Sequence, residues 1–285
     1  MNYRHAFHAG NHADVLKHIV LLALVDALKR KETPFFVLDT HAGRGRYLLG
    51  GSESRRTGEA ESGIFKLISQ PGLPAVVERY LRAVEADNPV GALIAYPGSP
   101  LLAAQAMRPQ DHLIACELQP EEAKELKSLF ARDTRVVVHE RDGYTAIKAL
   151  LPPKSGATRF ARGLVVIDPP YEAQHDEYPL VLDAIKETLQ RWPAATLAVW
   201  YPIKQRRSLR PFMRKIAHLP CKSAWTAELL VRPDDSPLRL NGSGMLVINP
   251  PWQLDEAIAP ALPALKSLLG ETGASSQLEW MKREA

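Results

Sequence analysis

The sequence predicts an α/β fold in which a mostly parallel, doubly wound sheet ends in an antiparallel hairpin near the C-terminus. Five short apolar runs alternate with stretches of helical periodicity, and four of them lead into a glycine loop or an acidic residue. Two further apolar runs are joined only by a polar loop. The five runs are 35–38, 112–117, 135–140, 164–167 and 196–201, and the pair is 226–231 and 244–248. In such sheets ligands bind at the carboxyl ends of the parallel strands.

The composition is that of a globular domain with a sizeable core. The chain has 285 residues, of which 46% are hydrophobic and 24% charged, and its formal net charge is +4. This charge permits a polyanionic partner without requiring one. Cys116 and Cys221 have neither metal-ligand nor redox spacing, which indicates free thiols in a reducing cytoplasm. We expect residues 1–285 to form a single domain.

The N-terminal segment shows no export or membrane signal. Arg4, His5 and His8 stand where a signal peptide would be apolar, and the apolar run 19–25 is interrupted by Asp26. We therefore expect neither secretion nor a membrane span.

The same segment is rich in histidine, which raises the question of a metal. His5, His8 and His12 could share one face of a helix, but Gly10 weakens that helix and no carboxylate or cysteine completes a ligand set. No metal site is predicted. Residues 13–30 then have the periodicity of a helix that packs along the sheet.

A glycine-containing loop, residues 39–47, follows the first apolar run. Gly43 and Gly45 allow the chain to turn from strand to helix close to a nucleotide-like ligand. The dinucleotide fingerprint would need a third glycine where Leu48 stands and an acidic residue about 20 positions later. An NAD site is therefore disfavoured.

Residues 48–98 interrupt the alternation of strands and helices. Residues 63–68 and 73–86 have the pattern of two amphipathic helices, so a small helical insertion within the domain is predicted. A core helix resumes near residue 101. Ser99 precedes it and is interpreted either as its N-cap or as a cofactor contact.

The next two strand ends carry acidic residues. Glu117 is a candidate for the ribose of a cofactor, because a carboxylate can accept hydrogen bonds from both hydroxyl groups. Asp142 can accept from the amino group of a cofactor adenine, and Gly143 permits close approach. A simple turn is the competing interpretation of Asp142 and Gly143.

Asp168, Pro169, Pro170 and Tyr171 follow the fourth strand and predict its chemistry. The amine of a nucleobase is a poor nucleophile, since its lone pair is delocalised into the ring. The Asp168 carboxylate and the Pro169 carbonyl could accept its N–H bonds, while Tyr171 stacks on the base. The pattern thus indicates methyl transfer to an amino group. An ordinary Pro-Pro turn after a strand is the alternative.

A second motif of the same kind, Asn249-Pro250-Pro251-Trp252, follows the last strand. Its late place in the chain and in an edge hairpin predicts a structural role, away from the glycine loop.

A one-signed basic segment lies between these two motifs. Residues 204–215 contain six cations and no acidic residue, and Arg206, Arg207 and Arg210 are the candidates for contact with RNA phosphates. A solvated helix face is the alternative interpretation.

Taken together, the motifs resemble those of the bacterial large-subunit ribosomal RNA adenine-N6 methyltransferases. The resemblance extends from residue 2 to residue 252. It rests on Tyr-Arg-His-x-Phe-His-Ala-Gly-Asn-His-Ala-Asp-Val-Leu-Lys-His at 3–18, Leu-Asp-Thr-His-Ala-Gly-x-Gly-Arg-Tyr at 38–47, Tyr-Pro-Gly-Ser-Pro at 96–100, Ile-Asp-Pro-Pro-Tyr at 167–171 and Ile-Asn-Pro-Pro-Trp at 248–252. The Asp-Pro-Pro-Tyr motif alone also fits guanine-N2 and DNA enzymes.

The resemblance implies a Rossmann-like methyltransferase domain that uses S-adenosylmethionine and methylates an adenine of 23S rRNA. It also implies the site residues. The expected cofactor residues are His18, His41, Gly43, Ser99, Glu117, Asp142, Gly143 and Asp168; Asp168 with Pro169 and Tyr171 would be catalytic, and Tyr3 would contact the RNA. We expect a cytoplasmic monomer. The alternatives are a DNA adenine-N6 or guanine-N2 methyltransferase, and a non-catalytic nucleic-acid-binding protein for DNA uptake or utilisation.

Overall fold

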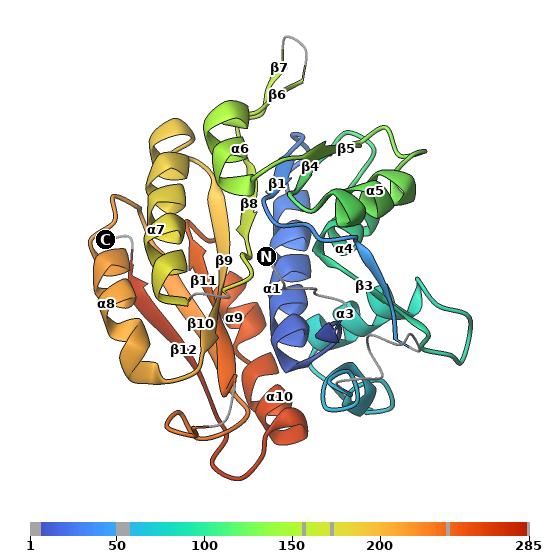
Figure 1. The fold of residues 1–285 in the computed structure, drawn as a ribbon, viewed down its shortest axis with the longest axis vertical. Helices are drawn as coiled ribbons and strands as arrows, with labels where there is room; N and C mark the ends of the chain where they lie inside the picture. The colour runs from blue at the N-terminus through green and yellow to red at the C-terminus, as the bar shows by residue number, and fades with distance from the viewer. Residues whose placement is uncertain (1–6, 50–57, 156–157, 172–173, 238–239, 284–285) are drawn as a thin grey trace.

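An eight-stranded mixed sheet forms the centre of the molecule, with helices on both faces (Figure 1). The structure is a computed structural model that describes residues 7–49, 58–155, 158–171, 174–237 and 240–283. The strand order is β12-β10-β11-β9-β8-β1-β4-β5. The strands are β1 (Phe36–Asp39), β4 (His112–Glu117), β5 (Val136–Glu140), β8 (Gly163–Ile167), β9 (Thr196–Ile203), β10 (Ala224–Leu230), β11 (Gly242–Ile248) and β12 (Ser275–Lys282).

The five strands from β9 to β5 are parallel, as the sequence predicts. The chain passes from β1 to β4 and β5 on one side, and then crosses to β8 and β9 on the other. The winding direction therefore reverses between β1 and β8, which is where doubly wound sheets bind ligands. All residues of β8 are buried, in agreement with its β-branched sequence.

The antiparallel part of the sheet is larger than the sequence indicates. The predicted hairpin is present as β10 and β11, but β11 pairs with β9 and β10 pairs with β12. The prediction that Asn249 ends an edge strand is therefore wrong. The edge is formed by β12, which follows α9 (Leu254–Ile258) and α10 (Ala261–Leu269) in a segment that the sequence analysis left unassigned.

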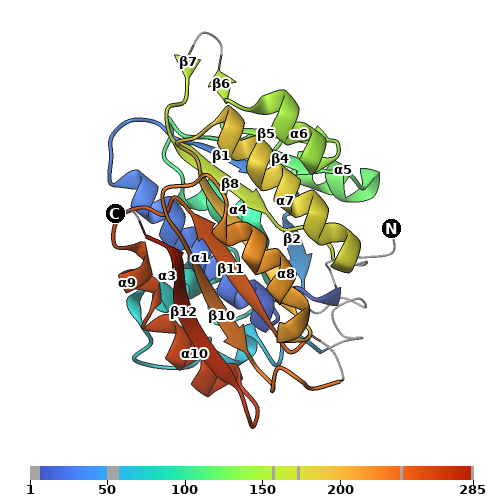
Figure 2. The ribbon, with the colours of Figure 1, turned by 90° about the vertical axis from the view of Figure 1, so that its left-hand side faces the viewer.

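The helices form two layers. One core cluster lies under α6 (Gly143–Leu150), α7 (Gln174–Arg191) and α8 (Arg206–Ala217). The other includes residues of α1 (His12–Lys29), α3 (Ala75–Glu85), α4 (Ser99–Ala106) and α5 (Pro120–Leu129), together with α9 and α10. Figure 2 shows α7 and α8 side by side on one face, with α1 behind the strands.

Helix α1 is the central helix of the second layer. Asn11 caps it by accepting from the backbone N–H groups of Ala13 and Asp14 at 2.9 and 3.0 Å. The helix is buried along most of its length, because it packs against the sheet on one side and against α3 and α4 on the other. Lys17 and His18 are consequently buried polar residues that must find partners inside the protein.

Within the described part of the segment 48–98, which lacks residues 50–57, there is one regular α-helix rather than two. The helix expected at 73–86 is α3, whereas 63–68 contains only the 3-10 turn η2 (Ile64–Lys66). At the start of this turn the chain packs backbone to backbone, since a Cβ on Gly63 would lie 2.0 Å from the carbonyl oxygen of Gly10. The sequence analysis also missed the antiparallel strands β2 (Arg46–Leu48) and β3 (Ala95–Pro97), which bring the two ends of the segment together.

No helix within the described ranges is long and apolar enough to cross a membrane. Within those same ranges, no group of three or more His, Cys, Asp or Glu side chains could hold a metal ion. Cys116 and Cys221 are both free and buried.

Candidate active site

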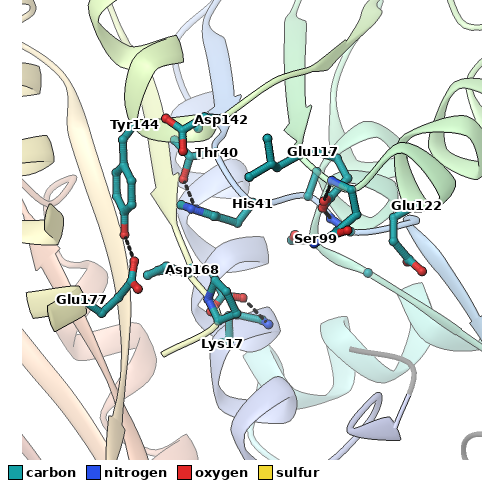
Figure 3. A pocket seen from close by; sticks show the side chains of 18 of the residues that line it. Lys17, Thr40, His41, Ser99, Glu117, Glu122, Asp142, Tyr144, Asp168 and Glu177 are labelled. Carbon is teal, nitrogen blue, oxygen red and sulfur yellow. Dashed lines mark hydrogen bonds and ion pairs between the residues drawn. The ribbon is translucent and has the colours of Figure 1, made fainter. Parts of the chain in front are cut away.

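A cavity of about 250 Å³ lies at the carboxyl ends of the parallel strands, where the winding direction reverses. It brings together most of the predicted site residues, although they come from six separate parts of the sequence (Figure 3). The predicted residues that line it are His18, His41, Gly43, Ser99, Glu117, Asp142, Gly143, Asp168 and Pro169.

Asp168 forms an ion pair that the sequence analysis did not identify. Lys17 Nζ lies 2.6 Å from Asp168 Oδ2 and 2.7 Å from Asp14 Oδ1. Burial alone would lower the pKa of the Lys17 ammonium, but the two carboxylates outweigh that cost and raise its pKa well above the usual value. Lys17 therefore stays charged and fixes one oxygen of Asp168. The i, i+3 spacing of Asp14 and Lys17 is visible in the sequence, whereas their distance to Asp168 is set by the fold.

Tyr171 does not line the cavity in this structure, and its stacking on a bound base stays a prediction. The side chain is buried, its hydroxyl donates to the carbonyl oxygen of Trp200 at 3.0 Å, and its ring contacts those of Tyr178 and Trp200. Burial raises its pKa well above the usual value, so the hydroxyl stays protonated. Tyr171 anchors the Pro-Pro turn to the hydrophobic core.

Glu117 holds the glycine loop. One carboxylate oxygen accepts from the backbone N–H of Gly43 at 2.9 Å, and the other accepts from that of Gln119 at 2.7 Å. Gly43 has a φ of +62°, and a Cβ there would lie 2.1 Å from the hydroxyl oxygen of Tyr47. Burial raises the pKa of Glu117. The carboxylate faces the cavity from a rigid position, and each oxygen retains a lone pair for a ligand hydroxyl.

Ser99 does not cap α4, which makes the helix-cap alternative wrong. The N-cap is Gly98, and the Ser99 hydroxyl instead donates to Asp39 Oδ2 at 2.7 Å. Asp39 ends β1 and is fully buried, and this burial raises its pKa to about 6. Asp39 lies within the sequence motif at 38–47, where no local pattern assigns it a role.

Asp142 is the N-cap of α6, because its Oδ1 accepts from the backbone N–H of Thr145 at 2.7 Å. Gly143 lines the cavity, and its lack of a side chain also serves the packing of the fold. A Cβ there would lie 2.0 Å from the carbonyl oxygen of Thr40, so the residue allows two backbone segments to pack closely, and its contact with a ligand stays a prediction. A ligand contact of the Asp142 carboxylate remains a prediction.

Two histidines line the cavity from different elements. His18 Nδ1 lies 2.8 Å from the hydroxyl of Tyr96, and His41 Nδ1 lies 2.7 Å from the hydroxyl of Thr40. Burial lowers the pKa of His41 to about 4, against the opposing influence of Asp168 and Asp142, so this ring is neutral near pH 7. The ring of His41 also makes an edge contact with Tyr144, at 5.0 Å between centroids.

The remaining walls contain residues that the sequence analysis did not select. Tyr144 donates to Glu177 Oε1 at 2.5 Å across the side formed by α6 and α7, as Figure 3 shows. On the opposite side, Glu122 accepts from Arg44 Nε at 2.8 Å. Glu122, Tyr144 and Glu177 lie within helices, where polar side chains are common on exposed faces, so no sequence signal distinguishes them.

The second proline motif lies at the other end of the strands from the cavity, near the amino ends of the parallel strands. β11 is antiparallel to β9, and Ile248 pairs with Leu197 near the start of β9. Asn249 has a φ of +49°; its side chain accepts from the backbone N–H of Lys222 and donates to the carbonyl oxygens of Pro193 and Ala195, at 3.1 to 3.2 Å. Asn249 thus fixes a turn, as predicted, though not in an edge strand.

The basic segment forms α8, which begins just after the carboxyl end of β9 and hence at the same sheet edge as the cavity. Arg206 makes a half-buried ion pair, since its Nη1 lies 2.7 Å from Oε2 of the buried Glu228. Arg207, Arg210 and Arg214 are exposed and lie at i, i+3 and i+7, on one side of the helix. The structure thus separates Arg206 from the other candidates. Tyr3, the remaining RNA candidate, lies outside the described residues.

The cavity suits a ligand that carries positive charge and hydroxyl groups. Carboxylates reach it from β4, from the loop after β5, from the turn after β8 and from two helices, and the ammonium group of Lys17 is already neutralised. The acidic residues concerned are Glu117, Glu122, Asp142, Asp168 and Glu177.

The chain matches one protein family and several known proteins over most or all of its length. Residues 32–282 match the family described as "Ribosomal RNA large subunit methyltransferase D, RlmJ". The chain is 43% identical over 286 residues to Ribosomal RNA large subunit methyltransferase J of Haemophilus influenzae, and 42% identical over 285 residues to the protein of that name from Escherichia coli strain K12; each alignment covers 100% of both proteins. The crystal structure of protein LPL1258 from Legionella pneumophila matches with a TM-score of 0.86 and 34% identity, over 95% of this chain and 98% of that one.

Proposed function

The chain belongs to the RlmJ family of ribosomal RNA large subunit methyltransferases, and from this premise we propose that it transfers the methyl group of S-adenosylmethionine to N6 of an adenine in 23S rRNA. One observation carries the assignment of the chemistry to Asp168. Its carboxylate and the adjoining Pro169 line the same cavity as the candidate cofactor residues, and Lys17 holds it in place.

The cavity fits this cofactor. S-adenosylmethionine carries a sulfonium, an ammonium, a carboxylate, two ribose hydroxyls and an adenine, and it supplies an electrophilic methyl group when bound. Glu117 would hold the ribose, Asp142 and Gly143 the adenine, and His18, His41 and Ser99 the amino-acid end. The acidic lining complements the cationic groups. Asp39 supports Ser99 through the hydrogen bond between them.

Asp168 and Pro169 would activate the target amino group. Because Oδ2 of Asp168 is bound by Lys17, Oδ1 is the oxygen placed to accept an N–H bond of the adenine, and the Pro169 carbonyl accepts the second. Both acceptors return electron density to N6 as it attacks, and Asp168 Oδ1 takes up the proton that N6 loses. Positioning by a rigid turn and preorganised charge supply the catalysis, without a covalent enzyme intermediate.

The RNA would approach over α8. Arg207, Arg210 and Arg214 form an exposed cationic face on a helix that starts at the same end of the parallel strands as the cavity, and such a face binds phosphates irrespective of sequence. The target adenine must be unpaired or flipped out to reach Asp168. Arg206 is better explained as a structural residue, because its partner Glu228 is buried.

Four further properties belong to this proposal. The segment 48–98 is an insertion within one domain, which is supported by the packing of Ile64, Tyr80 and Val84 into the same core cluster as α1. The protein acts as a monomer on free or precursor RNA, and it does so in the cytoplasm, where ribosomal RNA is processed. The family match favours RNA over the DNA-acting and non-catalytic alternatives.

The proposal is tested by incubating the protein with S-adenosylmethionine labelled in the methyl group and with protein-free 23S rRNA. Digestion to nucleosides should give labelled N6-methyladenosine at one position. Label in methylguanosine, or incorporation only into DNA, would contradict the proposal. Assembled large subunits serve as the comparison that tests the preference for free RNA.

A further inference from the structure

Two systems of buried hydroxyl groups form hydrogen bonds with the two histidines that line the cavity. Neither belongs to the chemistry described above. The first connects the segment 48–98 to His18, and the second connects the end of β8 to His41. Each system decides which ring nitrogen carries a proton.

His18 is the end of a chain of two tyrosines. The Tyr80 hydroxyl, on α3, lies 2.9 Å from that of Tyr96, on β3, which lies 2.8 Å from His18 Nδ1. All three side chains are fully buried, and burial raises the pKa of both tyrosines far above the usual value, so each hydroxyl keeps its proton.

The protons can be placed in only one satisfactory way. Within the described residues the hydrogen bond to Tyr96 is the one that the Tyr80 hydroxyl makes, so Tyr80 must donate to Tyr96. Tyr96 then donates to His18 Nδ1, which must be unprotonated. The reverse direction would leave a buried Tyr80 proton without an acceptor, which is costly. His18 therefore carries its proton on Nε2.

His41 is held in the opposite way. The Thr40 hydroxyl lies 2.8 Å from the carbonyl oxygen of Val166, which can only accept, so the single hydroxyl proton is used there. The contact of 2.7 Å between Thr40 Oγ1 and His41 Nδ1 then requires a proton on Nδ1. The lone pair of His41 is consequently on Nε2.

We infer that Tyr80 and Tyr96 on one side, and Thr40 on the other, are positioning residues that hold His18 and His41 as opposite neutral tautomers. The cavity then offers a ligand one imidazole donor and one imidazole acceptor. This pair complements the amino-acid end of the cofactor, whose carboxylate accepts hydrogen bonds and whose ammonium donates them. The cofactor part of this inference rests on the proposed function, whereas the tautomers do not.

The tautomers are tested by NMR on the ligand-free protein with ¹⁵N-labelled histidine, assigned with the His18→Gln and His41→Gln variants. We expect protonated Nε2 and bare Nδ1 for His18, and the reverse for His41. Tyr96→Phe should convert His18 to a mixture of tautomers while leaving His41 unchanged. Equal tautomers in the wild type, or an unaltered His18 signal in Tyr96→Phe, would overturn the inference.

Calorimetry then measures the consequence for cofactor binding. Tyr96→Phe should weaken the binding of S-adenosylmethionine about tenfold, Tyr80→Phe should weaken it less, and the double variant should resemble Tyr96→Phe, because both act through one ring. Tyr201→Phe is the matched control, since that buried hydroxyl donates to Glu228 at 2.8 Å in a different part of the sheet. Additive losses, or equal losses in Tyr201→Phe, would show that the tyrosines act only through stability.

The His18→Ala variant separates the role of His18 in cofactor binding from the role of the tyrosines in setting its tautomer. If this variant binds the cofactor normally, the assignment of His18 to the cofactor site fails, although the tautomers can still be as inferred. If His18→Ala binds weakly while Tyr96→Phe binds normally, the site stands and the positioning role of the tyrosines is contradicted.

Discussion

Lys17 Nζ lies 2.6 Å from Asp168 Oδ2, which joins α1 to the turn after β8. The same nitrogen lies 2.7 Å from Asp14 Oδ1, so two carboxylates share one buried cation. This arrangement orients the proposed catalytic group before any substrate arrives, and it makes the turn after β8 depend on α1.

Replacement of Lys17 should affect both stability and chemistry. Lys17→Met removes the cation that Asp14 and Asp168 share, and loss of one partner from a buried ion pair typically costs about 3–5 kcal/mol. We expect the free energy of unfolding, measured with urea, to fall by that amount, and we expect a lower single-turnover rate of methyl transfer. The double variant Asp14→Asn with Lys17→Met should recover part of the stability but not the rate. Recovery of both would mean that Lys17 only balances charge.

Asn249 should matter for folding. Asn249→Ala removes three hydrogen bonds and places alanine at a φ of +49°, so we expect a loss of about 2 kcal/mol in the free energy of unfolding. Asn249→Gly relieves the backbone strain and should lose less. If Asn249→Ala has wild-type stability, the structural role is contradicted.

The cations of α8 should separate into two groups. Replacement of Arg207, Arg210 and Arg214 by glutamine should weaken RNA binding and reduce the slope of log affinity against log salt by up to about 2 units, with unchanged cofactor affinity. Arg206→Gln should instead lower stability, because it leaves Glu228 buried without its ion-pair partner. An unchanged salt slope in the triple variant would mean that this helix face is only solvated.

His41 should make stability depend on pH. Folding lowers the pKa of His41 from 6.5 to about 4. The contribution of the neutral ring to the free energy of unfolding is therefore fully present above pH 6.5, and it is lost as the pH falls towards 4, because the unfolded chain takes up the proton first. Across this range the free energy of unfolding of the wild type should therefore fall by up to about 3 kcal/mol more than that of His41→Asn, at 1.36 kcal/mol per pKa unit. His12, whose pKa is also lowered to about 4, is common to both proteins and cancels in the comparison. Parallel pH profiles would show that His41 is solvated when folded.

The sequence predicts the site well where strand ends carry chemical groups. Glu117, Asp142 and Asp168 each end or follow a strand whose apolar pattern is clear, and the parallel sheet brings these ends together. Chain order also separated Asp168 from Asn249, although the strand that precedes Asn249 lies inside the sheet.

Other features could not be read from local pattern. Lys17 and Tyr144 are ordinary helical residues until the fold places them beside Asp168 and Glu177. Tyr171 follows the catalytic turn and looks like a stacking residue, but its ring direction depends on the space left by Trp200. The edge strand β12 lacks the buried alternation of a core strand, since its residues are half exposed or exposed.

The most direct test of the account compares Asp168→Ala with Asn249→Ala in one single-turnover experiment, with S-adenosylmethionine labelled in the methyl group and 23S rRNA at saturating concentration. The two residues end similar apolar strands and precede the same Pro-Pro-aromatic pattern, so each variant controls for the other. We predict that Asp168→Ala transfers methyl groups at least ~10²-fold more slowly, with cofactor and RNA bound, while folded Asn249→Ala stays within about tenfold of the wild type. A near-normal rate for Asp168→Ala would contradict the account.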